Sequence, residues 1–173
     1  MEDICRGLQE IVEHFPDVEL VVSVHKNPRM REVVMPALCH HSRIHLLDPV
    51  DYPVLVRMMK ASHFILTDSG GIQEEAPALG KPVLVLRRTT ERPEGVEAGT
   101  ARVVGTDPAR IFEESARLLT DPGAYADMSR AVNPYGDGRA SQRIIEAILH
   151  HFKIKPERPL PFSPEPTGAE KTP

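Results

Sequence analysis

The sequence predicts a Rossmann-like α/β fold, in which helices flank a parallel sheet of about six strands. Two observations lead to this prediction. Short apolar runs alternate along the chain with segments whose apolar residues recur at helical spacing. The apolar runs are nearly continuous, which is typical of strands that helices cover on both faces of a parallel sheet with right-handed crossovers.

Each element can be placed by its local pattern. The apolar runs predict strands at residues 20–24, 43–47, 63–67, 82–86 and 101–104. Helical spacing and helix-boundary residues predict helices at residues 4–14, 30–40, 52–62, 71–79, 108–119, 122–131 and 140–152. Gly80 directly follows one of these helices and is predicted as its C-cap, because glycine readily adopts the left-handed conformation that ends many helices.

Length and composition predict one globular domain with a C-terminal tail. The chain has 173 residues, of which 40% are apolar, and this suits a single domain of ordinary size. The Rossmann-like domain is expected to span residues 1–154. From residue 155 onward, prolines recur without a periodic apolar pattern, so residues 155–173 are predicted to be an extended or disordered tail.

Charge and cysteine content argue against several classes of function. A net charge of −4 argues against a general binder of nucleic acids or of anionic membranes. No apolar stretch reaches the roughly 18 residues of a membrane-spanning helix, and the N-terminus does not resemble a signal peptide. Cys5 and Cys39 lack the spacing of a CxxC motif, which favours free thiols and a cytoplasmic protein. The adjacent histidine pairs at 40–41 and 150–151 lack metal-ligand spacing.

The segment LTDSGGIQEEAPALG, residues 66–80, joins a predicted strand to a predicted helix and is the first candidate site. Ligands of open α/β sheets bind outside the carboxyl ends of the strands, where Ser69, Gly70 and Gly71 stand. The glycines allow close approach of the backbone to a ligand and positive φ angles. Unpaired N–H groups at the helix start and the Ser69 hydroxyl suit a phosphate. The alternative is that Ser69 is only an N-cap and the glycines only a tight turn.

Glu74 and Glu75 follow in the same predicted helix. Adjacent helical positions differ in direction by about 100°, so the two carboxylates cannot both face one ligand. Since a carboxylate repels a phosphate, its role at a ligand would be to accept hydrogen bonds from hydroxyl groups, such as those of a ribose. Spacing alone does not decide which glutamate would do so, and the other would be a solvated carboxylate.

Two further candidates follow other predicted strands. The loop at residues 86–100 opens on the same edge as Ser69 and carries Arg92, a candidate for bidentate contact with a diphosphate. Arg87 and Arg88 are predicted to be surface charges or partners of nearby glutamates. His25 follows the predicted strand at residues 20–24, and the alternative to a ligand role is a surface or capping histidine.

Three long stretches carry a resemblance to a known family: LTDSGGIQEEAPALGKPVLVLR, TTERPEGVEAGTARVVGTD and NPYGDGRASQRIIEAI. Together with VHKNPRMRE and IHLLDPVDY, they resemble in order and spacing the C-terminal half of the non-hydrolysing UDP-N-acetylglucosamine 2-epimerases. The resemblance covers about residues 4 to 152. It implies a glycosyltransferase-B-like architecture of two Rossmann-like domains with the active site between them, and this chain would be the second domain, which holds most of the UDP.

The resemblance also implies roles for single residues. Residues Ser69–Gly71 would donate hydrogen bonds to the diphosphate of a bound UDP. Glu75, rather than Glu74, would bind the ribose hydroxyls, and Arg92 would contact the nucleotide diphosphate. His25 matches a family histidine that lies near a second, regulatory UDP-GlcNAc molecule in bacterial members.

The implied reaction inverts the configuration at C2 of the sugar. UDP is eliminated to leave a 2-acetamidoglucal and is then added back to give UDP-ManNAc. A base must remove the C2 proton, and carboxylates must handle protons at the glycal stage. Helix N–H groups and Arg92 would stabilise the leaving diphosphate. This chemistry requires no redox cofactor or metal, and its partners are UDP and UDP-GlcNAc.

The family's acid/base carboxylates belong to sequence N-terminal of Ile4, which this chain lacks. We therefore expect a half-protein that is truncated or completed by a separate N-terminal-half chain, that binds UDP weakly and does not turn over substrate alone. A homodimer is also possible, since members of the family commonly form one. Two other hypotheses stay open: a non-catalytic UDP-sugar-binding or regulatory module, and the nucleotide domain of a glycosyltransferase. The loop at residues 89–100 favours the epimerases over the latter.

Overall fold

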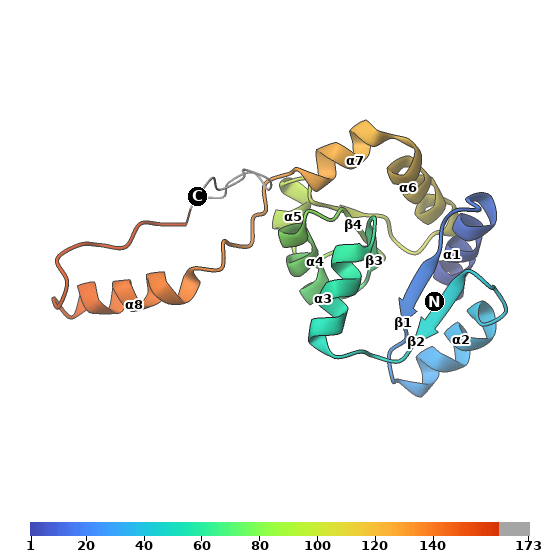
Figure 1. The fold of residues 1–173 in the computed structure, drawn as a ribbon, viewed down its shortest axis with the longest axis horizontal. Coiled ribbons are helices and arrows are strands. Elements are labelled where there is room, and N and C mark those ends of the chain that lie inside the picture. The colour runs from blue at the N-terminus through green and yellow to red at the C-terminus, as the bar shows by residue number, and fades with distance from the viewer. Residues whose placement is uncertain (163–173) are drawn as a thin grey trace.

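The computed structural model of the protein describes residues 1–162, and Figure 1 shows its fold. The described residues form the strands β1 (Leu20–Ser23), β2 (Ile44–Leu47), β3 (Ile65–Thr67), β4 (Val83–Val85) and β5 (Ala101–Val103). All of them pair in parallel, β1 with β2 in one sheet and β3, β4 and β5 in that order in another. The predicted α/β class with parallel strands is therefore confirmed.

The prediction of one sheet with about six strands is wrong. Within residues 1–162 the strands number five, in a two-stranded and a three-stranded sheet. After Val103 the regular elements are all helices, so this part of the described chain supplies no further strand. Each strand has only three or four residues, against about five or six in an average strand, so a small divergence between neighbours ends a ladder.

The helices follow the predicted segments closely, with one addition. They are α1 (Glu2–His14), α2 (Pro28–Leu38), α3 (Tyr52–Ala61), α4 (Gly70–Glu75) continued by the 3₁₀ turn η1 (Ala76–Leu79), α5 (Pro93–Glu97), α6 (Pro108–Thr120), α7 (Pro122–Ser129) and α8 (Ala140–His151). The added helix is α5, which lies in the segment predicted as a loop. Gly80 ends η1 with φ of 66°, which confirms its predicted role as a left-handed C-cap.

The core lies between the helices and the buried strands. Val83, Leu84 and Val85 of β4 are all fully buried, as the continuous apolar run predicts for a central strand. Helices α1 and α6 pack closely against each other, and Ile11 and Ile111 are fully buried there. This packing covers one side of the strands and leaves the loops at their carboxyl ends free to form a site.

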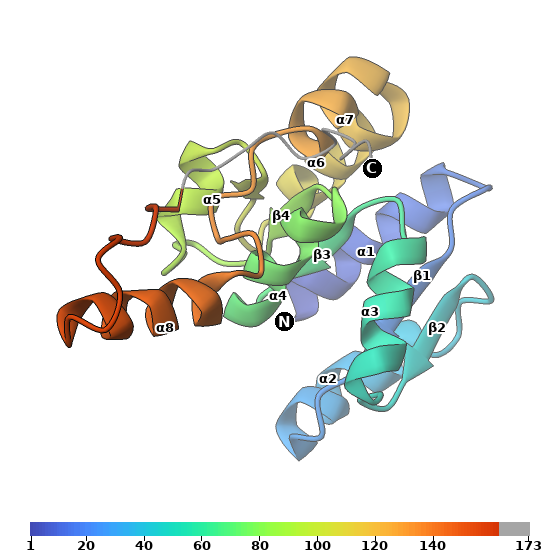
Figure 2. The same cartoon turned by 60° about the vertical axis from the view of Figure 1, so that its left-hand side comes forward.

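Helix α8 lies apart from the rest of the molecule in both views (Figures 1 and 2). None of its residues is buried, although Ile144, Ile145 and Ile148 give it an apolar side. Residues 155–162 contain no helix or strand, and the remainder of the predicted tail lies outside the described residues. None of the described helices has the length and apolar character needed to cross a bilayer.

Candidate functional site

The turn from β3 into α4 is held by hydrogen bonds to its own backbone. The Thr67 side chain, at the buried end of β3, accepts a hydrogen bond from the Ser69 N–H at 3.0 Å. Ser69 occupies the N-cap position of α4, but its side chain makes no capping hydrogen bond and the residue is exposed. Ser69 is thus the N-cap residue of α4, as the alternative expected, and its hydroxyl is not used to cap the helix.

The two glycines keep ordinary backbone angles. Neither Gly70 nor Gly71 is among the described glycines with positive φ, so the prediction that they use positive φ is wrong. What they provide is the absence of a side chain. A Cβ on Gly70 would lie 3.6 Å from Nη2 of Arg92, and a Cβ on Gly71 would lie 3.8 Å from Oε1 of Glu75 and 3.9 Å from the Ser69 hydroxyl. The structure thus brings Ser69 and Glu75 to the space beside Gly71, and Arg92 to the space beside Gly70.

Arg92 reaches this space from the loop after β4. Its Nε donates a hydrogen bond to Oε1 of Glu74, and this bond raises the pKa of the guanidinium above its ordinary value. The Arg92 side chain is 36% exposed and that of Glu74 is 40% exposed, so water reaches both groups. Glu74, to which the family resemblance gave no ligand role, is the residue that pairs with the arginine side chain.

Glu75 points to a different partner. The hydroxyl of Tyr52, at the start of α3, donates a hydrogen bond to Oε2 of Glu75 at 2.9 Å. The negative carboxylate favours the neutral phenol and raises the pKa of Tyr52. The expectation that adjacent glutamates diverge is confirmed, since Glu74 contacts Arg92 and Glu75 contacts Tyr52.

A buried glutamine connects the two loops of the site. Gln73 is only 1% exposed, and its amide nitrogen donates to the Ser69 carbonyl at 3.2 Å. Its amide oxygen accepts a hydrogen bond of 2.5 Å from the Thr90 hydroxyl, which also accepts the backbone N–H of Arg92 at 3.0 Å. Sequence reasoning missed Gln73 and Thr90. The sequence offered one signal, for Gln73. This polar residue lies three positions before Ala76 and four before Pro77, both of which are buried, and an apolar residue is expected at that helical spacing.

His25 lies at the carboxyl end of the other sheet. Its Nδ1 accepts a hydrogen bond from the Asn27 N–H at 3.1 Å, and the Asn27 side chain caps α2 through the Arg29 N–H at 3.0 Å. His25 is exposed, and none of the hydrogen bonds found in the described chain joins it to the Ser69 turn. The structure agrees with a surface histidine in a turn and leaves the regulatory role a prediction.

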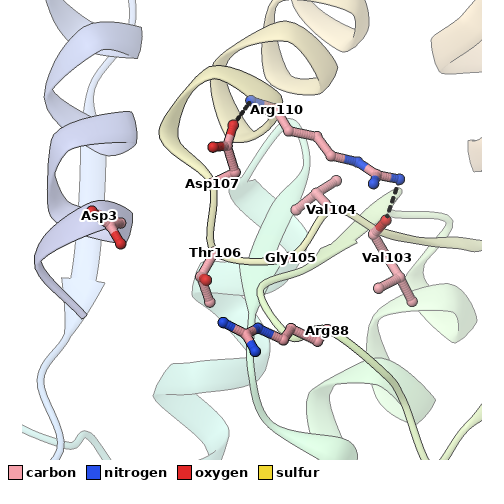
Figure 3. A pocket seen from close by; sticks show the side chains of 8 residues that line it. All are labelled: Asp3, Arg88, Val103, Val104, Gly105, Thr106, Asp107 and Arg110. Carbon is pink, nitrogen blue, oxygen red and sulfur yellow. Dashed lines mark hydrogen bonds between the residues drawn. The ribbon is translucent and has the colours of Figure 1, made fainter.

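A pocket of about 560 Å³ opens beside the end of β5 and the start of α6, and Figure 3 shows its walls. Arg88 faces it from the loop after β4, while the Arg110 guanidinium donates to the Val103 carbonyl at 3.1 Å. None of the predicted site residues lines this pocket. Its lining residues are Asp3, Arg88, Val103, Val104, Gly105, Thr106, Asp107 and Arg110.

The two other arginines of the loop after β4 behave as predicted. Arg87 pairs with Glu91 at 2.7 Å, which confirms the expected local ion pair. Arg88 is an exposed surface charge, at the wall of the pocket. Residues 1–162 contain no group of three or more histidine, cysteine, aspartate or glutamate side chains arranged to hold a metal ion.

Known proteins resemble this chain both in sequence and in fold. The chain matches the family described as UDP-N-acetylglucosamine 2-epimerase over residues 1–149. It is 51% identical over 163 residues to the UDP-N-acetylglucosamine 2-epimerase of Bacillus subtilis (strain 168), and the match covers 94% of this chain but 43% of that protein.

Solved structures agree with this match. The chain superposes on an S. aureus MnaA–UDP co-structure with a TM-score of 0.88 at 47% identity, covering 94% of this chain and 44% of that one. It superposes on UDP-GlcNAc 2-epimerase from Neisseria meningitidis bound to UDP-GlcNAc with a TM-score of 0.82 at 44% identity, covering 86% and 40%. It spans roughly two fifths of the length of the curated relatives it matches, 41% and 43% in two cases. The chain therefore belongs to the UDP-N-acetylglucosamine 2-epimerase family, as its motifs predict, and corresponds to the C-terminal half of its members.

Proposed function

We propose that this chain is the UDP-binding half of an enzyme that interconverts UDP-GlcNAc and UDP-ManNAc. In this proposal it is the second Rossmann-like domain of a glycosyltransferase-B-like architecture, and the sugar faces a cleft between two domains. UDP would be eliminated to give a 2-acetamidoglucal and then re-added. The relatives solved with UDP and with UDP-GlcNAc support this choice of ligand.

The observation that carries the proposal is the set of groups beside Gly70 and Gly71. The Arg92 guanidinium lies 3.6 Å from the position of a Cβ on Gly70, and the Ser69 hydroxyl lies 3.9 Å from that of a Cβ on Gly71. The first residues of α4 have N–H groups that no helical carbonyl can accept. A cation, a hydroxyl and unpaired backbone donors beside these two glycines form a set of partners that suits a diphosphate.

Each residue then has a defined role. The Ser69 N–H is bonded to Thr67, so the donors to the diphosphate are the Ser69 hydroxyl and the N–H groups of Gly70 and Gly71. Arg92 would neutralise the charge that develops on the diphosphate as it leaves the sugar. The carboxylate of Glu75 would accept hydrogen bonds from the ribose hydroxyls.

In this proposal the residues at the site bind and orient the nucleotide, and they are Ser69, Gly70, Gly71, Glu75 and Arg92. Proton transfer at the sugar would depend on carboxylates outside this chain. Alone, the chain is proposed to bind UDP weakly and to show no epimerisation. A separate chain that supplies the other domain, a homodimer, and a regulatory UDP-GlcNAc near His25 remain predictions. The free thiols of Cys5 and Cys39 are in keeping with a cytoplasmic protein.

The proposal is tested by calorimetric titration of the 173-residue chain with UDP. Arg92→Ala is expected to weaken UDP binding about 10- to 100-fold, as for a hydrogen bond to a charged group, and Glu75→Ala about 10-fold. Arg102→Ala is the matched control, because the Arg102 side chain is also 36% exposed and ion-paired, with Glu114 at 2.7 Å, but lies on β5 away from the turn. Equal UDP affinity in the wild type and in both site variants would contradict the assignment.

A further inference from the structure

We infer that Gln73 and Thr90 are positioning residues that hold the Ser69 turn and Arg92 in one fixed arrangement. The inference rests on the proposed function, since it concerns how the same site is organised. Gln73 lies on the side of α4 that faces the core, and its side chain is 1% exposed. A buried carboxamide needs partners for both its oxygen and its nitrogen, and Gln73 has one for each.

Three hydrogen bonds run in series between the two loops. The first joins the Gln73 amide nitrogen to the Ser69 carbonyl at 3.2 Å, and the second joins the Thr90 hydroxyl to the Gln73 amide oxygen at 2.5 Å. The third joins the Arg92 N–H to the Thr90 oxygen at 3.0 Å. Thr90 thus donates once and accepts once, and its hydroxyl is the only part of its side chain that takes part.

This series of hydrogen bonds links two loops that are otherwise joined by an ion pair accessible to water. Ser69 and Arg92 follow different strands, β3 and β4, and a diphosphate would have to contact both at once. The ion pair between Arg92 and Glu74 is accessible to water on both sides and contributes little to holding the loop. The amide of Gln73 is buried, so separating the loops would leave polar atoms unpaired in the core. These partly buried hydrogen bonds therefore fix the Arg92 backbone before a ligand arrives, and less ordering is needed on binding.

The first test removes only the Thr90 hydroxyl. Thr90→Val keeps the shape of the side chain and is expected to weaken UDP binding by about 5- to 30-fold, whereas Thr90→Ser keeps the hydroxyl and should stay within about twofold of the wild type. Equal affinities of the valine and serine variants would overturn the inference.

A double variant separates positioning from general damage. If Thr90 positions Arg92, then adding Thr90→Val to Arg92→Ala weakens UDP binding by less than Thr90→Val does in the wild type. Losses that multiply in full in the double variant would mean that Thr90 does not act on Arg92, and would overturn the inference.

A measurement without ligand distinguishes this inference from the proposed function. Gln73 makes no direct hydrogen bond to Arg92, yet Gln73→Leu is expected to speed hydrogen exchange of the Arg92 amide at least about fivefold in the ligand-free chain. Gln142→Leu, which removes an exposed glutamine bonded to Glu146 at 3.0 Å, is the matched control and should change nothing. Thr90→Val replaces Gln73→Leu here if the latter does not fold.

Failure of this inference and failure of the proposed function would give different experimental results. An Arg92 amide that exchanges at the wild-type rate in Gln73→Leu, or in Thr90→Val where that variant replaces it, overturns the inference even if UDP binds as proposed. A wild-type chain with no affinity for UDP overturns the proposed function and, with it, the role of these residues in ligand binding. Faster exchange in that case would still show that the two loops are linked.

Discussion

Both sheets are parallel, so each has an edge where its strands end and loops begin. The two edges differ in the contacts that hold these loops together. We call residues 67–75 with 90–92 the Ser69 edge, and residues 24–31 with 48 the His25 edge. The Ser69 edge is crossed by hydrogen bonds of a buried amide, Gln73, to both of its loops. The His25 edge has an exposed ion pair, Arg31 with Asp48 at 2.6 Å, and a histidine bonded only within its own turn.

In our proposal, this difference is what makes one strand end a site when many are available. Every parallel strand presents a loop at its carboxyl end, and the fold alone does not select among them. Buried polar groups do so, because a hydrogen bond that is shielded from water holds two loops at a fixed distance, and an exposed ion pair does not. We therefore expect substitutions at the Ser69 edge to have larger effects than those at the His25 edge.

The largest expected effect is on stability and comes from Gly95. This residue lies in α5, the helix that begins directly after Arg92. A Cβ at this buried glycine would lie 2.5 Å from the hydroxyl of Tyr135. Gly95→Ala is therefore expected to lower the free energy of unfolding by about 1–3 kcal/mol. Urea unfolding measures this change.

A second substitution checks the cause of that loss. Tyr135→Phe removes the hydroxyl that the new methyl group would strike, and alone it should cost less stability than Gly95→Ala. Combined with Gly95→Ala, it should restore most of the lost stability. Gly95→Ala with unchanged or increased stability would show that α5 is not held against Tyr135.

The next effect concerns Glu75, which we propose binds the ribose at the Ser69 edge. Tyr52→Phe removes the hydrogen bond to Glu75 and leaves the carboxylate free to rotate, so UDP binding is expected to weaken about threefold. The raised pKa of Tyr52 gives this bond a pH dependence with a defined sign. The neutral phenol donates the bond, which is present below the tyrosine pKa and is lost as the pH rises through it.

The ratio of wild-type to Tyr52→Phe affinity should accordingly be constant from neutral pH to about pH 9 and fall only above the ordinary tyrosine value of 10.0. Calorimetric titration with UDP at several pH values measures this ratio. A ratio that changes below about pH 9 would mean that another group controls Glu75.

The smallest effect is expected at the His25 edge. Arg31 lowers the pKa of Asp48 through an ion pair that water reaches on both sides, with side chains 35% and 70% exposed. Arg31→Ala should therefore leave the urea midpoint unchanged and UDP affinity within about twofold of the wild type. A loss of UDP affinity as large as that of Arg92→Ala would show that the two edges act as one site.

Part of this account could be predicted from the sequence because it depends on local patterns. A buried apolar run followed by Ser69 and two glycines indicates a strand end on the ligand side of a parallel sheet, and Gly80 indicates a left-handed cap. Neither requires knowledge of distant residues. The strand end at which we propose the site was accordingly predictable, as was the divergence of Glu74 and Glu75.

The remainder depends on residues far apart in the chain. Thr90 lies 17 positions after Gln73, and no periodicity relates a threonine in one loop to a glutamine in another. Helix α5 has five residues, too few for an apolar pattern to indicate a helix. The division into two sheets depends on how far β1 and β3 diverge, which is set by tertiary packing.

The most direct test of the central claim is a single methyl group at Gly70. Its Cβ would be in ordinary van der Waals contact with Arg92, at 3.6 Å from Nη2, and the backbone angle at Gly70 suits alanine. Gly70→Ala should therefore leave the free energy of unfolding unchanged while filling the space assigned to the diphosphate. We predict that UDP affinity falls at least about 10-fold with unaltered urea unfolding. Unchanged UDP affinity in Gly70→Ala would contradict the claim that the Ser69 edge binds the diphosphate.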